Sequence, residues 1–333
     1  MSRVTKAIVF PEPKRVEVRE VLLPELGPRD VLVRTLYSGI SIGTETWTLL
    51  NRYKGTIDAF PFIPGYQRSG VVEAAGAAVT RVRPGDRVFV RACRLAKEND
   101  IHPASWNGHV GASVCDESQV FPLPAGCDEK EAAFGIQIAV GCLGVRMSRV
   151  SQGDIVVVVG QGLIGQMSAQ AATRRGAFVI AADLLSKRVE LSARYSADLA
   201  IDASKEDLVR AVHRETAGAM ADVVVEATGR ASMFDACVDL VRREGTICMQ
   251  GYYPDLIQIE GHRTHLKRVH VNFPCAWDDD DVRSILRGLA KGTSAVRPLI
   301  THEYPVDEAP AAYAHILDHP GDVLGVLIDW TGK

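Results

Sequence analysis

The spacing of hydrophobic positions along the chain changes near residue 131. Before that point, short apolar or alternating runs are separated by turn residues. They predict strands at 7–10, 15–18, 30–34, 70–73 and 87–91. Short strands at this density are typical of a compact barrel or sandwich. We therefore expect a β-rich domain over residues 1–130.

From residue 131 onward, strand-like and helix-like segments alternate. The expected strands are 155–159, 178–183, 222–226, 245–250 and 269–273. The expected helices in this part are 132–148, 167–175 and 232–240. This alternation predicts a doubly wound parallel sheet. Past Trp277 the pattern predicts a helix, a strand, a second helix and a last strand, at 279–291, 299–302, 306–317 and 323–330. Since no Pro/Gly/Ser-rich linker separates these parts, we expect the 131–276 domain to be inserted between 1–130 and 277–333.

One stretch of this second domain carries a clear chemical signal. The apolar run from Ile155 to Val159 suits a strand buried on both faces and leads directly into Gly160-Gln-Gly162-Leu-Ile-Gly165. In this spacing the first glycine permits a tight turn, the second lets the backbone approach a pyrophosphate, and the third lets the next helix pack closely. The N–H groups of the helix start, at Leu163 and Ile164, would face that pyrophosphate. The stretch predicts dinucleotide binding.

The next predicted strand ends on Asp183, about 20 residues after Gly162. A carboxylate at this spacing binds the hydroxyls of the adenosine ribose. Because it would repel a 2′-phosphate, NAD is expected rather than NADP. The alternative is that Asp183 only caps the following helix.

The composition argues against two classes of partner. The 333 residues are 47% hydrophobic and 24% charged with a net charge of −3, so neither nucleic acid nor an anionic membrane is expected as a partner. No apolar run reaches the roughly 18 residues of a membrane-spanning helix, and the N-terminus lacks a signal-peptide pattern. We expect a cytoplasmic protein whose seven scattered cysteines are reduced.

Several segments together resemble the medium-chain dehydrogenase/reductase superfamily. The segments are 38–45, 62–71, 84–89, 107–111, 160–165 and 225–229. The resemblance implies an α/β fold: a Rossmann doubly wound parallel sheet inserted in a GroES-like β-rich catalytic domain, with the active site in the cleft. Segments 38–45, 64–67, 299–302 and 327–330 look most like the 3-hydroxyethyl bacteriochlorophyllide a dehydrogenase branch, which oxidises a secondary alcohol to a ketone.

The chain departs from the zinc-bearing members of this superfamily. The positions aligned with their catalytic zinc ligands are Ser41, Tyr66 and Ile136. Gln67 stands where those members have a neighbouring glutamate. These side chains cannot supply the thiolate, imidazole or carboxylate that zinc needs. The lobe between residues 91 and 111, where four cysteines would hold a structural zinc, contains only Cys93. We expect no metal in either site.

Without zinc, a side chain must take or relay the hydroxyl proton. Tyr66 is the first candidate, because the alignment places it toward the substrate, and Arg68 with a positive nicotinamide ring would favour its phenolate. The alternative is a tyrosine packed in the cleft wall. Thr44 and Glu45 could be relay and base, or the N-cap and first turn of a helix. His109 is a third candidate, or a structural histidine.

Further residues are expected around the substrate and the cofactor. The segment 91–107 suits a polar or anionic substrate if it lines the pocket mouth, and is otherwise a solvated loop. The expected pocket residues are Ser41, Trp47, Gln67, Arg68, Arg94, Trp106 and Asn107. The expected cofactor contacts beyond the glycine loop are Ala227, Thr228, Gly251 and Tyr252, in segments that could also be simple turns. Strand 269–273 looks like the edge that pairs across a dimer in this superfamily.

The sequence therefore predicts a homodimeric, NAD-dependent, zinc-independent dehydrogenase. It would oxidise a secondary alcohol of a small molecule, either polyol- or sugar-like or a hydroxyethyl chlorin, to a ketone by hydride transfer. The nearest enzymatic alternative is a zinc-free quinone or enone reductase, which Asp183 disfavours because those relatives mostly use NADPH. The alternative from another class is a non-catalytic dinucleotide sensor.

Overall fold

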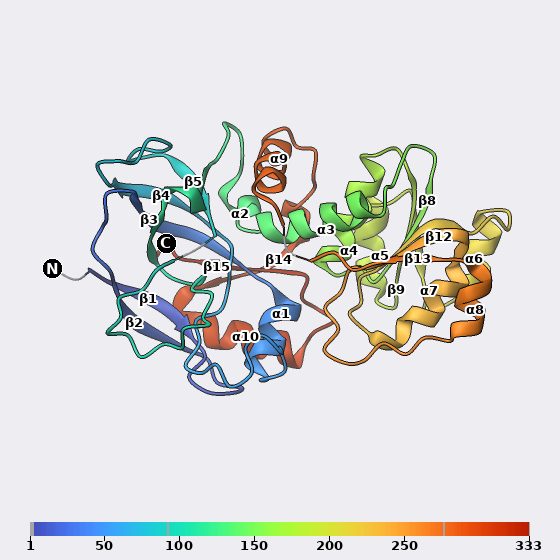
Figure 1. The fold of residues 1–333 in the computed structure, drawn as a ribbon, viewed down its shortest axis with the longest axis horizontal. Helices are drawn as coiled ribbons and strands as arrows, with labels where there is room; N and C mark the ends of the chain where they lie inside the picture. Colours follow the sequence, from blue (N-terminus) through green and yellow to red (C-terminus); the bar gives the residue numbers. More distant parts are fainter. Residues whose placement is uncertain (1–2, 92, 276, 333) are drawn as a thin grey trace. The chain divides into compact units, whose positions relative to one another are not determined.

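The computed structural model describes residues 3–91, 93–275 and 277–332. The chain forms two units (Figure 1). Unit 1 comprises Met1–Ile136 and Arg283–Lys333, and unit 2 comprises Gln137–Val282. The sequence predicted domain limits near residues 130 and 276. Unit 2 is thus inserted in the sequence of unit 1.

Unit 1 is built around a seven-stranded sheet of order β14-β15-β3-β4-β5-β7, with β6 also paired to β3, and a separate pair β1-β2. Its strands are β1 (Arg3–Val9), β2 (Glu17–Leu23), β3 (Asp30–Ile40), β4 (Arg68–Ala75), β5 (Arg87–Val90), β6 (Ala112–Asp116), β7 (Val120–Pro122), β14 (Ile300–Pro305) and β15 (Gly325–Asp329). The C-terminal β15 pairs with β3 in antiparallel register, Val326 opposite Ile40. Both ends of the chain therefore complete one β-rich unit.

Helices α1 (Ile42–Leu49), α2 (Glu129–Ala132) and α10 (Ala309–Asp318) belong to unit 1, while α3 (Gly135–Met147) and α9 (Asp279–Ala290) cross the unit limits. The helix expected over 132–148 is α3, which begins later, at Gly135, while the short α2 ends at Ala132. The Ile136 N–H at the start of α3 donates to the side-chain oxygen of Gln67 at 3.0 Å. Such a side-chain acceptor satisfies one of the N–H groups that a helix start leaves open.

Unit 2 is a parallel six-stranded sheet of order β10-β9-β8-β11-β12-β13. Its strands are β8 (Ile155–Val159), β9 (Phe178–Asp183), β10 (Leu199–Asp202), β11 (Ala221–Glu226), β12 (Val241–Met249) and β13 (His270–Asn272). Its helices are α4 (Leu163–Thr173), α5 (Ser186–Tyr195), α6 (Leu208–Glu215), α7 (Phe234–Leu240) and α8 (Gly261–Lys267). This strand order is that of a Rossmann domain. The predicted fold class is confirmed.

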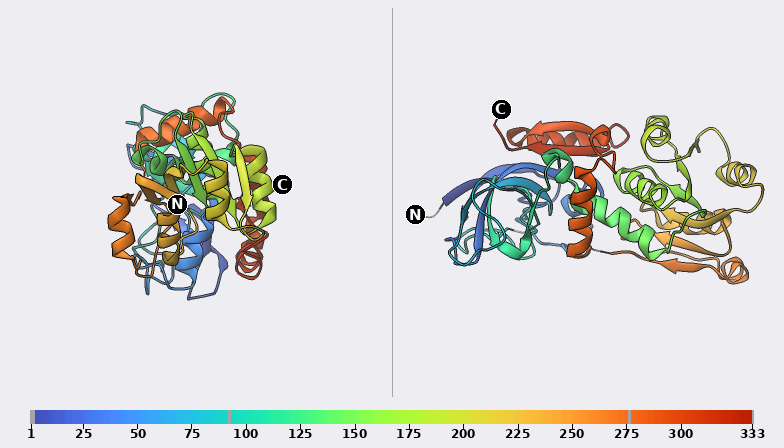
Figure 2. Two further views of the ribbon diagram at one scale, coloured as in Figure 1. Left: turned by 90° about the vertical axis from the view of Figure 1, so that its right-hand side faces the viewer. Right: turned by 90° about the horizontal axis from the view of Figure 1, so that it is seen from above.

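The two faces of the unit 2 sheet bury alternate residues of the same strands. Val157 and Val159 of β8 belong to a core cluster with α6 and α7, whereas Val156 and Val158 belong to a cluster with α4 and the end of α3. Helices thus cover both faces of the sheet (Figures 1 and 2). The unbroken apolar run of β8 is explained by this double burial.

All seven cysteines are free thiols, as the sequence predicted. Among the described residues, no helix is both long enough and apolar enough to cross a membrane. A cytoplasmic location stays a prediction.

Candidate active site

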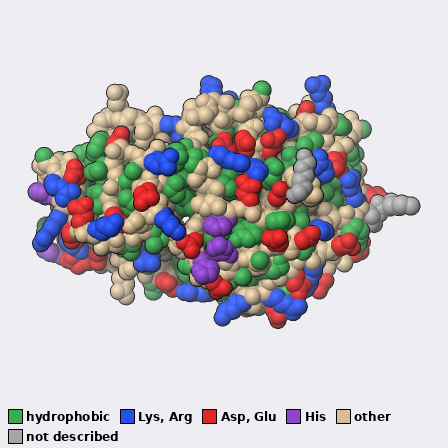
Figure 3. All heavy atoms as spheres, turned by 180° about the vertical axis from the view of Figure 1, so that it is seen from behind, with side chains coloured by type: hydrophobic (Ala, Val, Ile, Leu, Met, Phe, Trp, Pro, Cys, Tyr) green, Lys and Arg blue, Asp and Glu red, His purple; other side chains and the backbone are tan. Residues whose placement is uncertain are grey.

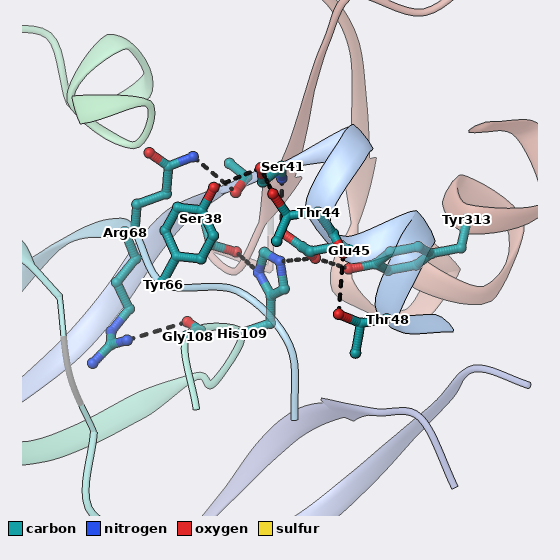
Figure 4. A network of polar contacts seen from close by, with 12 residues as sticks. Ser38, Ser41, Thr44, Glu45, Thr48, Tyr66, Arg68, Gly108, His109 and Tyr313 are labelled. Atoms are coloured by element: carbon teal, nitrogen blue, oxygen red, sulfur yellow. Dashed lines mark hydrogen bonds and ion pairs between the residues drawn. The ribbon is translucent and has the colours of Figure 1, made fainter. Parts of the chain in front are cut away.

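Three hydroxyl groups meet where β3 passes into α1. Ser41 is the N-cap of α1, Thr44 lies in its first turn, and Tyr66 precedes β4 (Figure 4). They are brought together because β3 and β4 are paired, with Ser38 opposite Arg68. The Tyr66 hydroxyl donates to Ser41 Oγ at 2.6 Å, and Ser41 Oγ donates to Thr44 Oγ1 at 3.3 Å. Ser41 is buried, while Thr44 and Tyr66 are half-buried.

Burial raises the pKa of the Tyr66 phenol well above its ordinary value. The hydrogen bond with Ser41 lowers this pKa again in part, and the negative charge of Glu45 raises it further. The Arg68 guanidinium points elsewhere: its Nη1 donates to the carbonyl oxygens of Asn107 and Gly108, each at 3.2 Å. The prediction that Arg68 favours a Tyr66 phenolate is therefore wrong, and Tyr66 is a neutral phenol at physiological pH.

Glu45 is completely buried in the first turn of α1. Its Oε1 accepts the backbone N–H of Ser41 at 2.7 Å, and its Oε2 accepts His109 Nε2 at 3.0 Å and the Tyr313 hydroxyl at 2.5 Å. A carboxylate with no exposed surface and these three contacts favours the role of an anchor, and its assignment as a substrate base stays a prediction. The alternative placement of Glu45 in a first helical turn holds. The N-cap, however, is Ser41 rather than Thr44, since Glu45 reaches back to the Ser41 N–H.

His109 is also completely buried, and it continues the chain that ends on Glu45. Its Nδ1 lies 2.7 Å from Ser38 Oγ, which also accepts Trp330 Nε1 at 2.8 Å. These contacts hold the buried His109 ring between Ser38 and Glu45, which favours the structural alternative. Its assignment as a catalytic residue stays a prediction.

Trp106 lies next to the hydroxyl cluster. Its ring centroid is 5.8 Å from that of Tyr66, and it also packs edge-to-face on Phe62 and Tyr53. Trp47 lies on α1, with the Arg52 guanidinium 4.4 Å above its ring. Tyr66, Trp106, Phe62 and Tyr53 thus form an aromatic wall in which Trp106 contacts the other three rings.

Other residues expected in the pocket instead support the framework. Gln67 is buried, with its amide bonded to the Gly39 carbonyl at 3.4 Å and to the Ile136 N–H at 3.0 Å. Asn107 Nδ2 donates to the Cys93 carbonyl at 3.2 Å. Arg68, also completely buried, holds the 107–108 turn as described above. These contacts tie the three side chains to the framework, and their place in the pocket stays a prediction.

Arg94 is placed far from the hydroxyl cluster. Its guanidinium pairs with Asp30, the first residue of β3, whereas Ser41 directly follows the other end of that strand. At about 3.3 Å per residue, the two ends lie about 30 Å apart. The lobe that carries Arg94 packs on β2, where Asn99 bonds the Leu22 N–H at 2.8 Å and its carbonyl at 2.9 Å. The prediction of Arg94 as a pocket residue is wrong.

The side chains at the aligned zinc positions do not fit zinc. Ser41 and Tyr66 are bonded to each other as neutral hydroxyl groups, and Ile136 is a buried alkyl side chain. Across the part of the chain that the structure describes, no three His, Cys, Asp or Glu side chains are close enough to hold a metal ion. No metal-assisted step can be derived from these residues.

Histidine side chains also gather on the surface (Figure 3). In unit 1 the ring centroids of His302 and His315 are 4.7 Å apart, and those of His315 and His319 are 5.3 Å apart. The Tyr304 hydroxyl lies 2.7 Å from His315 Nδ1. Burial, with the neighbouring His315, lowers the pKa of His302. This group shares no residue with the hydroxyl cluster.

The glycine loop of unit 2 has the geometry that a pyrophosphate requires. Gly160 has φ 89°, and a Cβ there would lie 2.7 Å from the Thr228 side chain. A Cβ on Gly162 would meet nothing within 4 Å, whereas one on Gly165 would lie 1.9 Å from the Gly160 carbonyl oxygen. Helix α4 starts directly after Gly162, so the N–H groups of Leu163 and Ile164 have no helical carbonyl as partner. The loop therefore offers open space at Gly162 directly beside the free N–H donors at the start of α4.

Asp183 ends β9 beside this loop. Its Oδ2 accepts the Gln161 N–H at 2.7 Å, its Oδ1 accepts the Leu185 N–H at 2.9 Å, and Arg188 Nη1 is 3.9 Å from Oδ2. The N-cap of α5 is Leu185, without a side-chain cap. The alternative that Asp183 caps this helix is therefore wrong. Glycines and acid together fit a nicotinamide dinucleotide.

The turns after β11 and β12 are organised by Glu226, which is completely buried. Its carboxylate accepts the N–H of Thr228 at 2.8 Å and of Gly229 at 3.3 Å, and it contacts the Tyr253 hydroxyl. Burial and this carboxylate hold the pKa of Tyr253 far above its ordinary value. A Cβ on Gly251 would lie 2.6 Å from Gly229 Cα, so the two turns are in contact. Residues Ala227, Thr228, Gly251 and Tyr252 thus lie together at the carboxyl edge of the sheet, where doubly wound folds bind ligands.

Several residues of these sites were not singled out from the sequence. Gln161 lies inside the predicted glycine loop, and Tyr253 directly follows the predicted cofactor contacts Gly251 and Tyr252. Only these neighbours in the sequence indicated that the two residues belong to a site. Tyr313 was counted within an apolar helix, and its bond to Glu45 joins positions 268 residues apart. No local sequence pattern predicts such a contact.

The chain matches two protein-family models, the alcohol dehydrogenase GroES-like domain over residues 27–125 and the zinc-binding dehydrogenase over residues 164–291. It is 30% identical over 284 residues to a probable alcohol dehydrogenase of Mycobacterium tuberculosis, which covers 74% of this chain and 76% of that protein. A sorbitol dehydrogenase of Halalkalibacterium halodurans is 28% identical over 331 residues, covering 93% and 94%.

Among solved structures, a putative zinc-binding dehydrogenase from Sinorhizobium meliloti bound to NADP has the same fold. Its TM-score is 0.84 at 24% identity, covering 98% of this chain and 99% of that one. The sequence matches extend over both units, and the fold agrees along nearly the whole chain. The chain therefore belongs to the alcohol dehydrogenases of the medium-chain dehydrogenase/reductase family.

Proposed function

We propose that this protein is a zinc-independent, NAD-dependent dehydrogenase that oxidises a secondary alcohol to a ketone. One observation carries the proposal. The hydroxyl groups of Ser41 and Tyr66, which the resemblance aligns with zinc ligands, are bonded to each other, and Ser41 is bonded to Thr44. The other two candidates, Glu45 and His109, are completely buried. Neutral hydroxyl groups, rather than a metal or an exposed carboxylate, would handle the proton.

A nicotinamide dinucleotide held by the glycine loop and Asp183 would supply the hydride acceptor. The substrate hydroxyl would donate to Tyr66, which already donates to Ser41, which donates to Thr44. Each hydroxyl group gives up one proton as it receives one, so none needs to carry a full charge. Thr44 is half-exposed and its neighbour Gly43 is exposed, so the proton can leave to water there. The donor direction along this chain is the direction of proton release during oxidation.

The choice of NAD over NADP is supported by Asp183, whose carboxylate stands at the ribose position. Arg188 nearby would favour a 2′-phosphate, and the relative from Sinorhizobium meliloti binds NADP. Titration with NADH and NADPH tests the assignment. Tighter binding of NADPH would overturn it.

The substrate class is supported by the relatives and by the aromatic wall. Alcohol and sorbitol dehydrogenases among the relatives favour an alcohol or a polyol. The rings of Trp106 and Tyr66 would equally pack on a flat apolar group such as a hydroxyethyl chlorin.

A substrate panel distinguishes the proposed function from its alternatives. We expect NAD-dependent oxidation of one or more secondary alcohols. Reduction of enones or quinones with NADPH, without any alcohol oxidation, would identify a reductase instead. Tight NADH binding without turnover in either direction would identify a sensor.

We also propose that two copies pair through β13. This strand is the edge of the unit 2 sheet, and Val271 and the following Phe273 are 40% and 56% exposed. Apolar side chains on an open strand edge are a pairing surface. Light scattering should give the mass of a dimer for the wild type and of a monomer for Val271→Lys/Phe273→Lys. A monomeric wild type would refute the pairing.

A further inference from the structure

A ladder of buried polar side chains lies between α4 and α5, directly behind the glycine loop. We call it the Gln–Ser ladder, and its members are Gln161, Gln166, Gln170, Ser192 and Ser196. Gln161 belongs to the loop, Gln166 and Gln170 are one turn apart on α4, and Ser192 and Ser196 are one turn apart at the end of α5. None is more than 5% exposed. Helix interfaces in a Rossmann sheet layer are ordinarily filled by apolar side chains, so this polar interface calls for a physical reason.

Hydrogen bonds join the members of the ladder. Gln161 Nε2 donates to the Val158 carbonyl at 2.9 Å, and Ser192 Oγ shares its one hydrogen between Gln161 Oε1 at 3.0 Å and the Arg188 carbonyl at 2.9 Å. Ser192 Oγ also accepts Gln166 Nε2 at 2.9 Å. Ser196 then donates to Gln166 Oε1 and accepts Gln170 Nε2 at 3.3 Å.

Such a ladder fixes the register of two helices. Apolar contacts have no direction, so they tolerate small sliding movements of α5 along α4. Buried hydrogen bonds do not, because each displaced donor or acceptor would be left unsatisfied away from water. The cost of a displaced rung holds α4 and α5 in one position.

The first rung of the ladder is also part of the cofactor site. Gln161 lies between Gly160 and Gly162, and its backbone N–H donates to Asp183 Oδ2 at 2.7 Å. Its side chain is held from behind by Val158 and Ser192. The ladder thereby sets the distance between the loop that would take the pyrophosphate and the carboxylate that would take the ribose.

We propose that the Gln–Ser ladder positions the adenosine half of the dinucleotide, with Gln161 and Ser192 as positioning residues and Gln170 as a purely structural rung. The proposal rests on the cofactor binding proposed above. It assigns a binding role to residues that would not touch the cofactor through their side chains. Their effect would decline with distance along the ladder from the loop.

Three variants test this decline. Gln161→Met and Ser192→Ala remove rungs at the loop, and Gln170→Met removes the matched rung at the far end. Calorimetric titration with NADH and with AMP, which contains only the adenosine half, is combined with Tm and with kcat at saturating NAD. We expect the two loop variants to weaken NADH and AMP binding alike, by about tenfold, and to raise the KM for NAD more than they lower kcat. Gln170→Met should lower Tm but leave both Kd values within about twofold.

The outcomes separate this proposal from the proposed function. A wild type that binds neither NADH nor NADPH overturns the proposed function, and the ladder's role with it. A wild type that binds NADH, with Kd changes that follow the loss of Tm equally in all three variants, overturns only the ladder, since the rungs would then be merely structural. Unchanged NADH and AMP binding in Ser192→Ala, the mildest variant, also overturns the positioning role of the ladder. Recovery of binding in Ser192→Thr, which restores a hydroxyl group, supports the proposal.

Discussion

At the scale of single residues, Tyr66 is a phenol that keeps its proton. Burial raises its pKa, and the buried charge of Glu45 adds to the effect. Glu45 itself is completely buried and held by Ser41, His109 and Tyr313. The residue proposed to act on the substrate oxygen is therefore neutral, and the buried carboxylate beside it is proposed as an anchor.

Replacing Tyr66 by Phe removes the hydroxyl group and keeps the ring beside Trp106. We expect kcat for alcohol oxidation to fall by about 100-fold or more, with the fold intact. Because burial raises the pKa of the Tyr66 phenol and the proposed relay uses its protonated form, kcat/KM for oxidation should show no loss from Tyr66 ionisation up to about pH 10. Tyr53→Phe, whose ring also packs on Trp106, is the matched control. Near-normal turnover in Tyr66→Phe would refute the role.

Replacing Glu45 by Gln tests the buried anchor. The amide brings two donors into a site where three donors already converge, so we expect the free energy of unfolding to fall by about 2–4 kcal/mol. Urea denaturation measures the change. Glu12→Gln, which alters an exposed pair with Arg15, should change it by less than about 0.5 kcal/mol. Unchanged stability with lost turnover would return Glu45 to the role of base.

At the scale of elements, the sequence predicts a helix or strand well when its residues form one continuous apolar run that is buried. Strand β8 was predicted with its observed limits, and β9 ends on Asp183 as expected, because both runs are apolar throughout. Helix α5 gave no comparable signal, since its one buried residue is Ser192 rather than an apolar side chain. Helix α3 was expected from residue 132 but begins at Gly135, next to Ile136, whose N–H donates to Gln67, 69 residues earlier in the chain. Helix limits next to such distant polar partners are therefore placed less well.

The glycine loop offers a matched pair of substitutions at this scale. Gly162→Ala adds a methyl group into open space, so it should leave Tm unchanged and weaken NADH binding by about tenfold or more. Gly165→Ala forces a Cβ to within 1.9 Å of the Gly160 carbonyl oxygen. It should cost about 1–3 kcal/mol of stability or more. Calorimetry on both variants checks the two effects. Normal NADH binding by Gly162→Ala would show that the loop holds no pyrophosphate.

At the scale of the whole molecule, each unit closes around contacts between residues far apart in sequence. Unit 1 needs β15 from the C-terminal end to complete the sheet at β3, and Tyr313 and Trp330 complete the chain that ends on Glu45. The family resemblance predicted this assembly and the aligned site positions. It could not predict that Arg94 pairs with Asp30, or that Gln67 and Arg68 face the framework, since side-chain direction depends on neighbours that no single segment contains.

Buried thiols predict how the whole molecule responds to pH. Burial raises the pKa of Cys115 and of Cys248 to about 12 each. The unfolded thiols ionise near pH 8.5, so above that pH the unfolded state binds fewer protons and stability falls as pH rises toward about 12. Cys248→Ala should flatten this fall, by up to about 1.4 kcal/mol per pH unit. Cys275→Ala, which changes an exposed thiol, should not. Tm measured from pH 8 to pH 11 compares them, and equal slopes would contradict the assignment.

The central claim is that hydroxyl groups, rather than zinc, handle the substrate proton. Its most direct test is the rate of secondary-alcohol oxidation with NAD after exhaustive dialysis against a chelator, with zinc counted in the same sample. The account predicts an unchanged kcat at far less than about one zinc per chain. Activity that disappears on chelation and returns with about one zinc per chain would contradict it.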